Sequence, residues 1–117
     1  MKKVYYLSTC DTCKRIMKSL DLTGFEQQDI KTAPITAAQL DEMHALAGSY
    51  EALFSKIARK YRSLGLNEKA LTEADFKSHI LAEYTFLKRP VFIIDDQIFI
   101  GNAKKNVAAL QEVIGKA

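Results

Sequence analysis

The feature that most constrains the fold is a pair of four-residue runs near the C-terminus, separated by only two aspartates. Val91–Ile94 and Gln97–Ile100 are rich in β-branched and aromatic side chains. Asp95-Asp96 between them is a turn sequence. The pattern predicts a β-hairpin, so two strands of the fold are antiparallel.

The N-terminal third predicts a β-α-β unit. Lys3–Leu7 is a run of β-forming residues, and Phe25–Ile30 is a second, more polar one. Between them, after Cys10, apolar residues recur at helical spacing and Gly24 follows as a stop signal; these residues are Ile16, Met17 and Leu20. A helix between two strands favours a parallel pair with a right-handed crossover.

The middle of the chain predicts helices. Thr36–Gln39 and Thr72–Asp75 have the form of capping boxes at helix starts. Tyr50–Arg62 also has helical spacing, and Leu64–Leu66 interrupts it. A last helix is expected after Gly101-Asn102, with a buried stripe of Val107, Leu110, Val113 and Ile114.

These elements predict an α/β protein with a mixed four-stranded sheet flanked by helices. We expect one domain over residues 1–117, with a core of about 1–33 and 86–117 and a helical insert of about 34–85. A Cys-x-x-Cys pair after the first strand makes this the layout of a thioredoxin-like chain.

Composition narrows the function classes. The net charge is only +3, and Lys and Arg are spread among Asp and Glu, so we expect no direct binding of nucleic acid. No apolar run approaches membrane-spanning length, and Val4–Leu7 is too short for an export signal. We therefore expect a cytoplasmic protein with no membrane partner, and two cysteines in a reducing compartment point to catalysis, redox sensing or metal binding.

Cys10 and Cys13 are the chemical centre of the sequence. Cys10 lies where the helix begins, and there unpaired backbone N–H groups and the helix dipole favour a thiolate. Lys14 and Arg15 add positive charge and outweigh Asp11 in this interpretation. Cys13 lies one helical turn later, so Cys10 can attack a substrate and Cys13 can resolve the intermediate.

Two other interpretations of the cysteines stay open. Both could be small buried hydrophobic residues, although Asp, Thr, Lys and Arg around them fit this poorly. A metal site would need further ligands, and the spacings of His44 and His79 match no zinc-finger pattern. We predict no metal.

Arg89-Pro90 forms a second candidate group, immediately before the hairpin. A proline that opens a strand can be cis, and in a thioredoxin-like sheet that bend would lie beside the thiol. Arg89 would then present a planar cation to an anionic substrate or to the thiolate. The alternative is a surface Lys-Arg pair before an ordinary trans proline.

The chain resembles the arsenate reductase family, which includes Spx-like members, over nearly all of its 117 residues. The resemblance is carried by Cys10–Cys13, the helical middle, Leu64–Asn67 and Lys88–Val91. It implies that the Cys10 thiolate attacks arsenate, and that Arg89 and Pro90 help to bind the oxyanion. It further implies that an external thiol, glutathione with glutaredoxin, completes the reduction without a bound cofactor.

The resemblance leaves two functions open. The family's reductases use further arginines at positions that correspond to Ser55 and to the neighbourhood of Gly101, so it implies thiol chemistry more directly than arsenate reduction. We expect a thiol oxidoreductase acting on a small oxyanion or a thiol or disulfide substrate. The alternative is a regulator like the Spx branch, which carries Cys-x-x-Cys, senses oxidation and binds the RNA polymerase α subunit.

Overall fold

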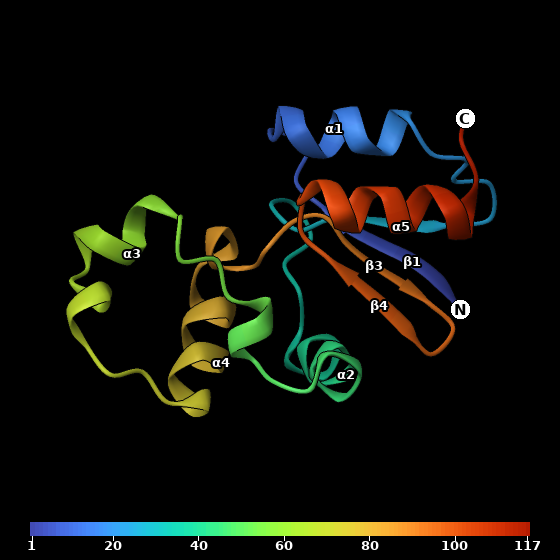
Figure 1. Cartoon of the computed structure of the whole chain (residues 1–117). Helices are drawn as coiled ribbons and strands as arrows, with labels where there is room; N and C mark the ends of the chain where they lie inside the picture. Colours follow the sequence, from blue (N-terminus) through green and yellow to red (C-terminus); the bar gives the residue numbers. More distant parts are fainter. The chain divides into compact units, whose positions relative to one another are not determined.

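The computed structural model describes residues 1–117, which divide into two compact units. The sheet unit consists of Met1–Ala33 and Arg89–Ala117, and the helical unit consists of Pro34–Lys88. In Figure 1 the sheet unit takes the blue and the orange-red ends of the colour scale. None of the helices combines the length and the apolar character needed to cross a lipid bilayer.

The sheet unit contains the predicted mixed four-stranded sheet (Figure 1). Its strands are β1 (Lys2–Tyr6), β2 (Glu26–Asp29), β3 (Val91–Ile94) and β4 (Gln97–Ile100), in the order β2-β1-β3-β4. Strand β1 is parallel to β2 and antiparallel to β3, and β3 is antiparallel to β4. The β-α-β unit and the hairpin are both confirmed, and Asp95 in the hairpin turn has a φ of +54°.

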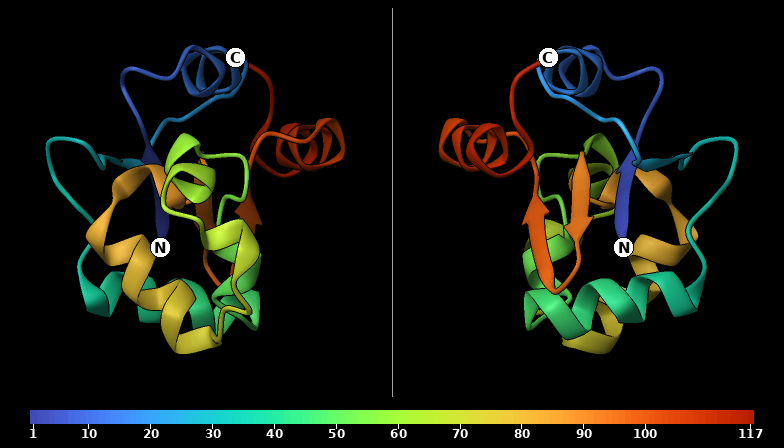
Figure 2. Two further views of the ribbon diagram at one scale, coloured as in Figure 1. Left: turned by 90° about the vertical axis from the view of Figure 1, so that its left-hand side faces the viewer. Right: turned by 90° about the vertical axis from the view of Figure 1, so that its right-hand side faces the viewer.

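Helices α1 (Asp11–Lys18) and α5 (Lys104–Ile114) cover the same face of this sheet (Figure 2). One core joins β1, α1, β3 and α5, and its buried members are Val4, Ile16, Leu20, Phe92 and Leu110. The alternation of side chains along β1 and β3 turns Val4 and Phe92 to the helices. Burial of this face fixes α1, and with it the cysteine pair, against the sheet.

Helix α1 ends earlier than Gly24, where the sequence predicted its end. Ser19 caps it, because the Ser19 hydroxyl and backbone N–H both donate to the Ile16 carbonyl, at 2.7 and 3.1 Å. The predicted stripe of α5 is also partly wrong, since Val113 is 48% exposed. Val107 and Ile114 flank Leu110 on one side of the helix, whereas Val113 lies about 60° away on the other side.

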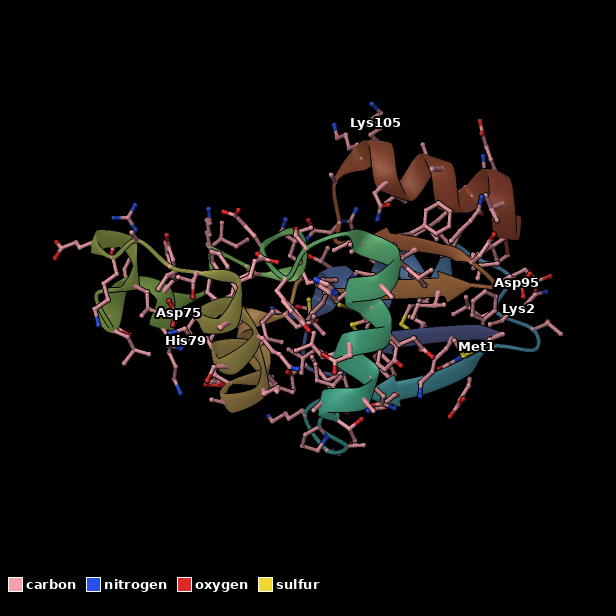
Figure 3. The ribbon with its side chains drawn as sticks, turned by 90° about the horizontal axis from the view of Figure 1, so that it is seen from below. Met1, Lys2, Asp75, His79, Asp95 and Lys105 are labelled. Carbon is pink, nitrogen blue, oxygen red and sulfur yellow. The ribbon has the colours of Figure 1, made fainter.

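The N-terminus is held at the hairpin turn, at the end of the sheet where β1 begins. The Met1 ammonium group lies 2.8 Å from Asp95 Oδ1, and the Asp95 N–H donates to the Met1 carbonyl at 2.7 Å. Figure 3 shows Met1, Lys2 and Asp95 together at this end. The cysteines follow the other end of β1.

The helical unit has three helices and three short 3₁₀ turns. They are α2 (Ala37–Ala47), η1 (Glu51–Leu53), α3 (Arg59–Ser63), η2 (Leu66–Glu68), α4 (Glu73–Ala82) and η3 (Tyr84–Phe86). Both predicted capping boxes are confirmed. Thr36 and Gln39 cap α2 with two hydrogen bonds of 3.1 Å, and Thr72 and Asp75 cap α4 at 2.9 and 3.2 Å.

The predicted helix over Tyr50–Arg62 is wrong. Phe54 is extended, with a ψ of 128°, and forms an antiparallel bridge with Leu87. The Phe54 ring is buried and stacks on Phe86 with a centroid distance of 5.0 Å. Pairing and aromatic burial outweigh the local helical pattern here. Ile57, an apolar residue within that pattern, is 91% exposed.

Candidate active site

Cys10 lies in the N-cap position of α1, at the end of the short loop that follows β1. Its N–H donates to the Leu7 carbonyl at 3.0 Å, which closes a turn. Its carbonyl accepts the Lys14 N–H at 3.2 Å, so the helix begins immediately after it. The N-cap backbone is extended, with φ −98° and ψ 109°. Cys10 therefore stands beside the first helical N–H groups, which have no partner within the helix.

The surroundings of the Cys10 thiol lower its pKa. Partial burial acts in the opposite direction, because it disfavours the charged form. Hydrogen bonds from the Cys13 N–H, the Cys13 thiol and the Thr12 N–H outweigh it, together with the positive charge of Arg89. Several donors therefore converge on one half-buried sulfur, which is the environment of a reactive thiolate.

Cys13 has the opposite character. It is fully buried on the inner side of α1, and burial, together with the hydrogen bond to Cys10 and the Cys10 charge, raises the pKa of Cys13 to about 11. The Leu7 N–H and Arg89 offset this only in part. Cys13 therefore stays protonated at neutral pH, and its S–H group donates a hydrogen bond to the Cys10 sulfur. Neither cysteine forms a disulfide in the structure, and the two side chains lie within hydrogen-bonding reach of each other.

Arg89-Pro90 lies at the same end of the sheet as the cysteine loop. The register pairs Tyr5 with Val91, so the end of β1 and the start of β3 lie side by side, and the loop after β1 is close to the residues before β3. The Arg89–Pro90 peptide bond is cis, and Pro90 is buried. Arg89 is half-buried, with its Nε buried, and its charge lowers the pKa of both cysteines.

Known proteins of one family resemble this chain in sequence and in fold. A family model described as the ArsC family matches residues 5–110. The chain belongs to the ArsC family. No curated protein matches the chain significantly.

Solved structures share the fold of this chain. SACOL0876 from Staphylococcus aureus COL is 28% identical, with a TM-score of 0.75 over 94% of this chain and 98% of that chain. An arsenate reductase (ArsC) related protein from Brucella melitensis is 23% identical, with a TM-score of 0.68 over 92% of both chains. The arsenate reductase from Vibrio cholerae is 15% identical, with a TM-score of 0.72 over 97% of both chains. The fold of this ArsC-family chain is thioredoxin-like, and the family is one of thiol oxidoreductases.

Lys14 and Arg15 are not among the main causes of the lowered Cys10 pKa, although the sequence predicted that they would be. Both side chains are exposed on α1. The principal groups that lower the Cys10 pKa are backbone donors, Cys13 and Arg89, and neither Lys14 nor Arg15 is among them. Their contribution to thiolate stabilisation stays a prediction.

The structure offers the cysteines no metal partner. Nowhere in the chain do three side chains of the His, Cys, Asp and Glu types gather as they would around an ion. His44 and His79 both belong to the helical unit, where they contact aromatic rings. His44 stacks on Tyr50 at 4.1 Å, and His79 meets the edge of Phe86 at 5.8 Å.

One residue of this neighbourhood was missed in the sequence. Asp29, the last residue of β2, accepts a hydrogen bond from the Ser8 N–H at 3.3 Å, two residues before Cys10. The contact joins residues 21 positions apart. No local pattern predicts it, because it exists only once β2 has paired with β1.

Proposed function

We propose that the chain is a thiol-dependent oxidoreductase in which Cys10 is the nucleophile, Cys13 the resolving thiol and Arg89 the anion-binding partner. The supporting observation is the opposite displacement of two facing thiols: the pKa of Cys10 is lowered, and that of Cys13 is raised to about 11. One sulfur is thus available as a thiolate while the other holds a proton beside it. This division of roles suits two-step thiol exchange.

A disulfide substrate would be reduced in two balanced steps. The Cys10 thiolate attacks one sulfur of the substrate, forms a mixed disulfide and expels the other sulfur as a thiolate, which takes up a proton. Formation of that bond removes the negative charge of Cys10 and with it one cause of the raised Cys13 pKa. Cys13 then loses its proton, attacks Cys10 and releases the second substrate thiolate. The substrate gains two electrons, and the protein is left with a Cys10–Cys13 disulfide.

An oxyanion substrate would begin at the same sulfur. The Cys10 thiolate would attack the central atom, and one oxygen would leave as water after protonation. Cys13 would then attack the Cys10 sulfur, so that the bond between Cys10 and the central atom breaks, its electron pair reduces that atom by two electrons, and the Cys10–Cys13 disulfide forms. Arg89 would hold the remaining oxygens through its planar guanidinium group. The positions at which the family resemblance implies further arginines correspond to Ser55 and to the neighbourhood of Gly101, and neither Ser55 nor Gly101 is charged. We infer that arsenate is a poorer substrate than a disulfide.

An external thiol must return the oxidised protein to the dithiol form. Two equivalents of a small thiol, or one dithiol protein, reduce the Cys10–Cys13 disulfide and become oxidised in turn. We propose glutathione, alone or through glutaredoxin, as this donor, with no resident cofactor. The proposal also assigns the protein to the cytoplasm, where such donors keep thiols reduced.

A turnover assay tests this proposal directly. The protein is supplied with glutathione and glutaredoxin, and reduction of a small disulfide is measured beside reduction of arsenate. Cys10→Ser should lower disulfide turnover to the rate of glutathione and glutaredoxin without the protein, whereas Cys13→Ser should retain the first step only. Equal turnover by wild type and Cys10→Ser would refute the proposal.

A second function is favoured by the same pair of thiols. A dithiol that closes reversibly can report oxidation without any turnover, as the resemblance to the Spx branch implies. Capture of the RNA polymerase α subunit that depends on oxidation of Cys10 and Cys13, in the absence of disulfide turnover, would favour this regulatory role. Capture that Cys13→Ser leaves unchanged would count against it.

A further inference from the structure

The loop that carries Cys10 is tied to the edge of the sheet by one carboxylate. Asp29 Oδ1 accepts the Ser8 N–H at 3.3 Å and the Lys31 N–H at 3.1 Å. The Ser8 hydroxyl also donates to Asp29, and this bond is the largest cause of a lowered Asp29 pKa. Asp29 thus holds both polar groups of Ser8, the backbone amide and the side chain.

The position of Ser8 makes this contact relevant to Cys10. Strand β1 ends at Tyr6 and α1 begins at Asp11, so the residues between them belong to neither element. The Cys10 N–H donates to the Leu7 carbonyl inside this loop. On the strand side, the Ile30 N–H donates to the Tyr6 carbonyl at 2.9 Å, which brings the end of β2 alongside the start of the loop.

The chemistry of Cys10 depends on accurate placement of this loop. The Cys10 thiolate is favoured by the N–H groups of Thr12 and Cys13, which belong to α1. Cys10 itself is the last residue of the loop, so the position of the loop sets the distance from its sulfur to these donors. Hydrogen bonds weaken steeply with distance and angle, and those to an anion are the stronger kind. A small displacement of the loop relative to α1 would therefore cost part of the thiolate stabilisation.

We propose that Asp29 is a positioning residue for the nucleophile, which acts by fixing Ser8 and thereby the sulfur of Cys10 relative to its donors. This inference rests on the proposed function, since it assumes that the Cys10 thiolate is the reactive group. Asp29 does not touch the reacting atoms in this account. Its effect passes through the loop from Ser8 to Cys10.

The sign of the effect separates positioning from simple electrostatics. A carboxylate near a thiol disfavours the thiolate, so removal of its charge alone would lower the Cys10 pKa or leave it unchanged. Removal of a positioning contact would raise it. A rise in the Cys10 pKa on loss of a nearby negative charge is therefore a result that only the positioning role predicts.

The test measures the pH dependence of Cys10 alkylation by iodoacetamide in the full chain, with the modified cysteine identified by mass spectrometry. Asp29→Ala should slow alkylation about three- to tenfold at neutral pH, because the Cys10 pKa rises as donors are lost. Asp29→Asn keeps an oxygen that can accept the Ser8 N–H, so its rate should fall between those of wild type and Asp29→Ala. Ser8→Ala removes only the hydroxyl, and a smaller slowing is expected.

Asp21→Ala is the matched control. Asp21 Oδ1 accepts the Thr23 N–H at 3.2 Å and the Thr23 hydroxyl at 2.7 Å, so it makes the same kind of contact in the same unit, away from the Cys10 loop. Its removal should leave the Cys10 pKa unchanged. If Asp29→Ala fails to fold, Asp29→Asn and Ser8→Ala give the result.

Two outcomes overturn the inference in different ways. An unchanged or lowered Cys10 pKa in the Asp29 and Ser8 variants, with a lowered pKa in wild type, refutes the positioning role alone. A wild-type Cys10 that titrates at or above an ordinary thiol refutes the activated nucleophile of the proposed function, and the inference fails with it. A raised pKa in the variants of Asp29 and Ser8 but not of Asp21 supports it.

Discussion

The thiol of Cys13 donates a hydrogen bond to the sulfur of Cys10 from one helical turn away. Cys13 is fully buried and Cys10 is half-buried, so the pair has one accessible and one protected sulfur. This asymmetry follows from the position of α1. Its first residues meet solvent at the N-cap, whereas the face that contains Cys13 and Ile16 is buried.

Loss of the resolving thiol should trap the first intermediate. In Cys13→Ser, the Cys10 thiolate can still form a mixed disulfide with a small disulfide such as oxidised glutathione, but no second sulfur lies within reach to release it. The adduct should accumulate to one per chain and be detected by mass spectrometry of the intact protein. Cys10→Ser, as control, should form none, and a Cys13→Ser protein that does not accumulate adduct would contradict the assignment.

Loss of the Arg89 charge should raise the Cys10 pKa. Arg89 is the one cationic side chain among the main causes of the lowered pKa, so Arg89→Ala should raise the Cys10 pKa towards that of an ordinary thiol. Arg89→Lys should keep part of the effect, since the charge remains while the planar guanidinium is lost. Titration of the thiolate absorbance in a Cys13→Ser background reports this pKa.

Lys105→Ala is the control for that experiment. Lys105 is an exposed cation of the same unit and projects outward from α5 (Figure 3). Its removal changes the net charge by the same amount as Arg89→Ala. If both variants shift the Cys10 pKa equally, the effect is one of overall charge, and Arg89 has no special place at the site.

The buried Cys13 should make stability fall at alkaline pH. Its pKa is about 11 in the folded chain and about 8.5 when unfolded, so between these values the unfolded state loses a proton that the folded state keeps. The stability that Cys13 contributes is therefore complete below about pH 8.5 and is lost as the pH rises towards 11. Cys10 acts in the opposite sense, because its folded pKa is lowered: its contribution is present above the unfolded pKa and is lost as the pH falls through the folded one.

Thermal unfolding between pH 8 and 11 measures this loss of stability. Tyrosines and lysines also titrate in this range, so the comparison is with Cys13→Ser, whose hydroxyl does not titrate. The melting temperature of wild type should fall more steeply with pH than that of Cys13→Ser. Parallel curves would mean that Cys13 is not buried in its protonated form.

The capping box of α2 should contribute measurably to stability. The Thr36 hydroxyl accepts the Gln39 N–H, and the Gln39 side chain accepts the Thr36 N–H, each at 3.1 Å. Thr36→Ala should lower the free energy of unfolding by about 1 kcal/mol, whereas Thr36→Ser keeps the acceptor and should cost much less. Urea unfolding followed by circular dichroism measures both, and equal losses in the two variants would contradict the cap.

Local signals in the sequence predicted much of this fold. The hairpin turn at Asp95-Asp96, the capping boxes at Thr36 and Thr72 and the start of α1 after Cys10 each depend on neighbouring residues. These features need no information from distant parts of the chain. They were correct because local geometry and tertiary structure favour the same conformation.

The features that the sequence did not predict depend on residues far away in the chain. Phe54 leaves the helical pattern because it pairs with Leu87, 33 positions later in the printed sequence. Asp29 reaches Ser8 only across two paired strands. Neither contact has a signature within a short stretch of sequence. The sequence therefore indicated Cys10, Cys13 and Arg89 as site residues, but it did not indicate Asp29.

The pH-dependent alkylation of Cys10 in the wild-type chain decides whether this sulfur is an activated nucleophile. Cys10 should react as a thiolate with a pKa below that of an ordinary cysteine, and Cys13 should stay unmodified until the chain unfolds. A Cys10 that titrates like a free thiol, or a Cys13 that reacts as fast as Cys10, would contradict this assignment.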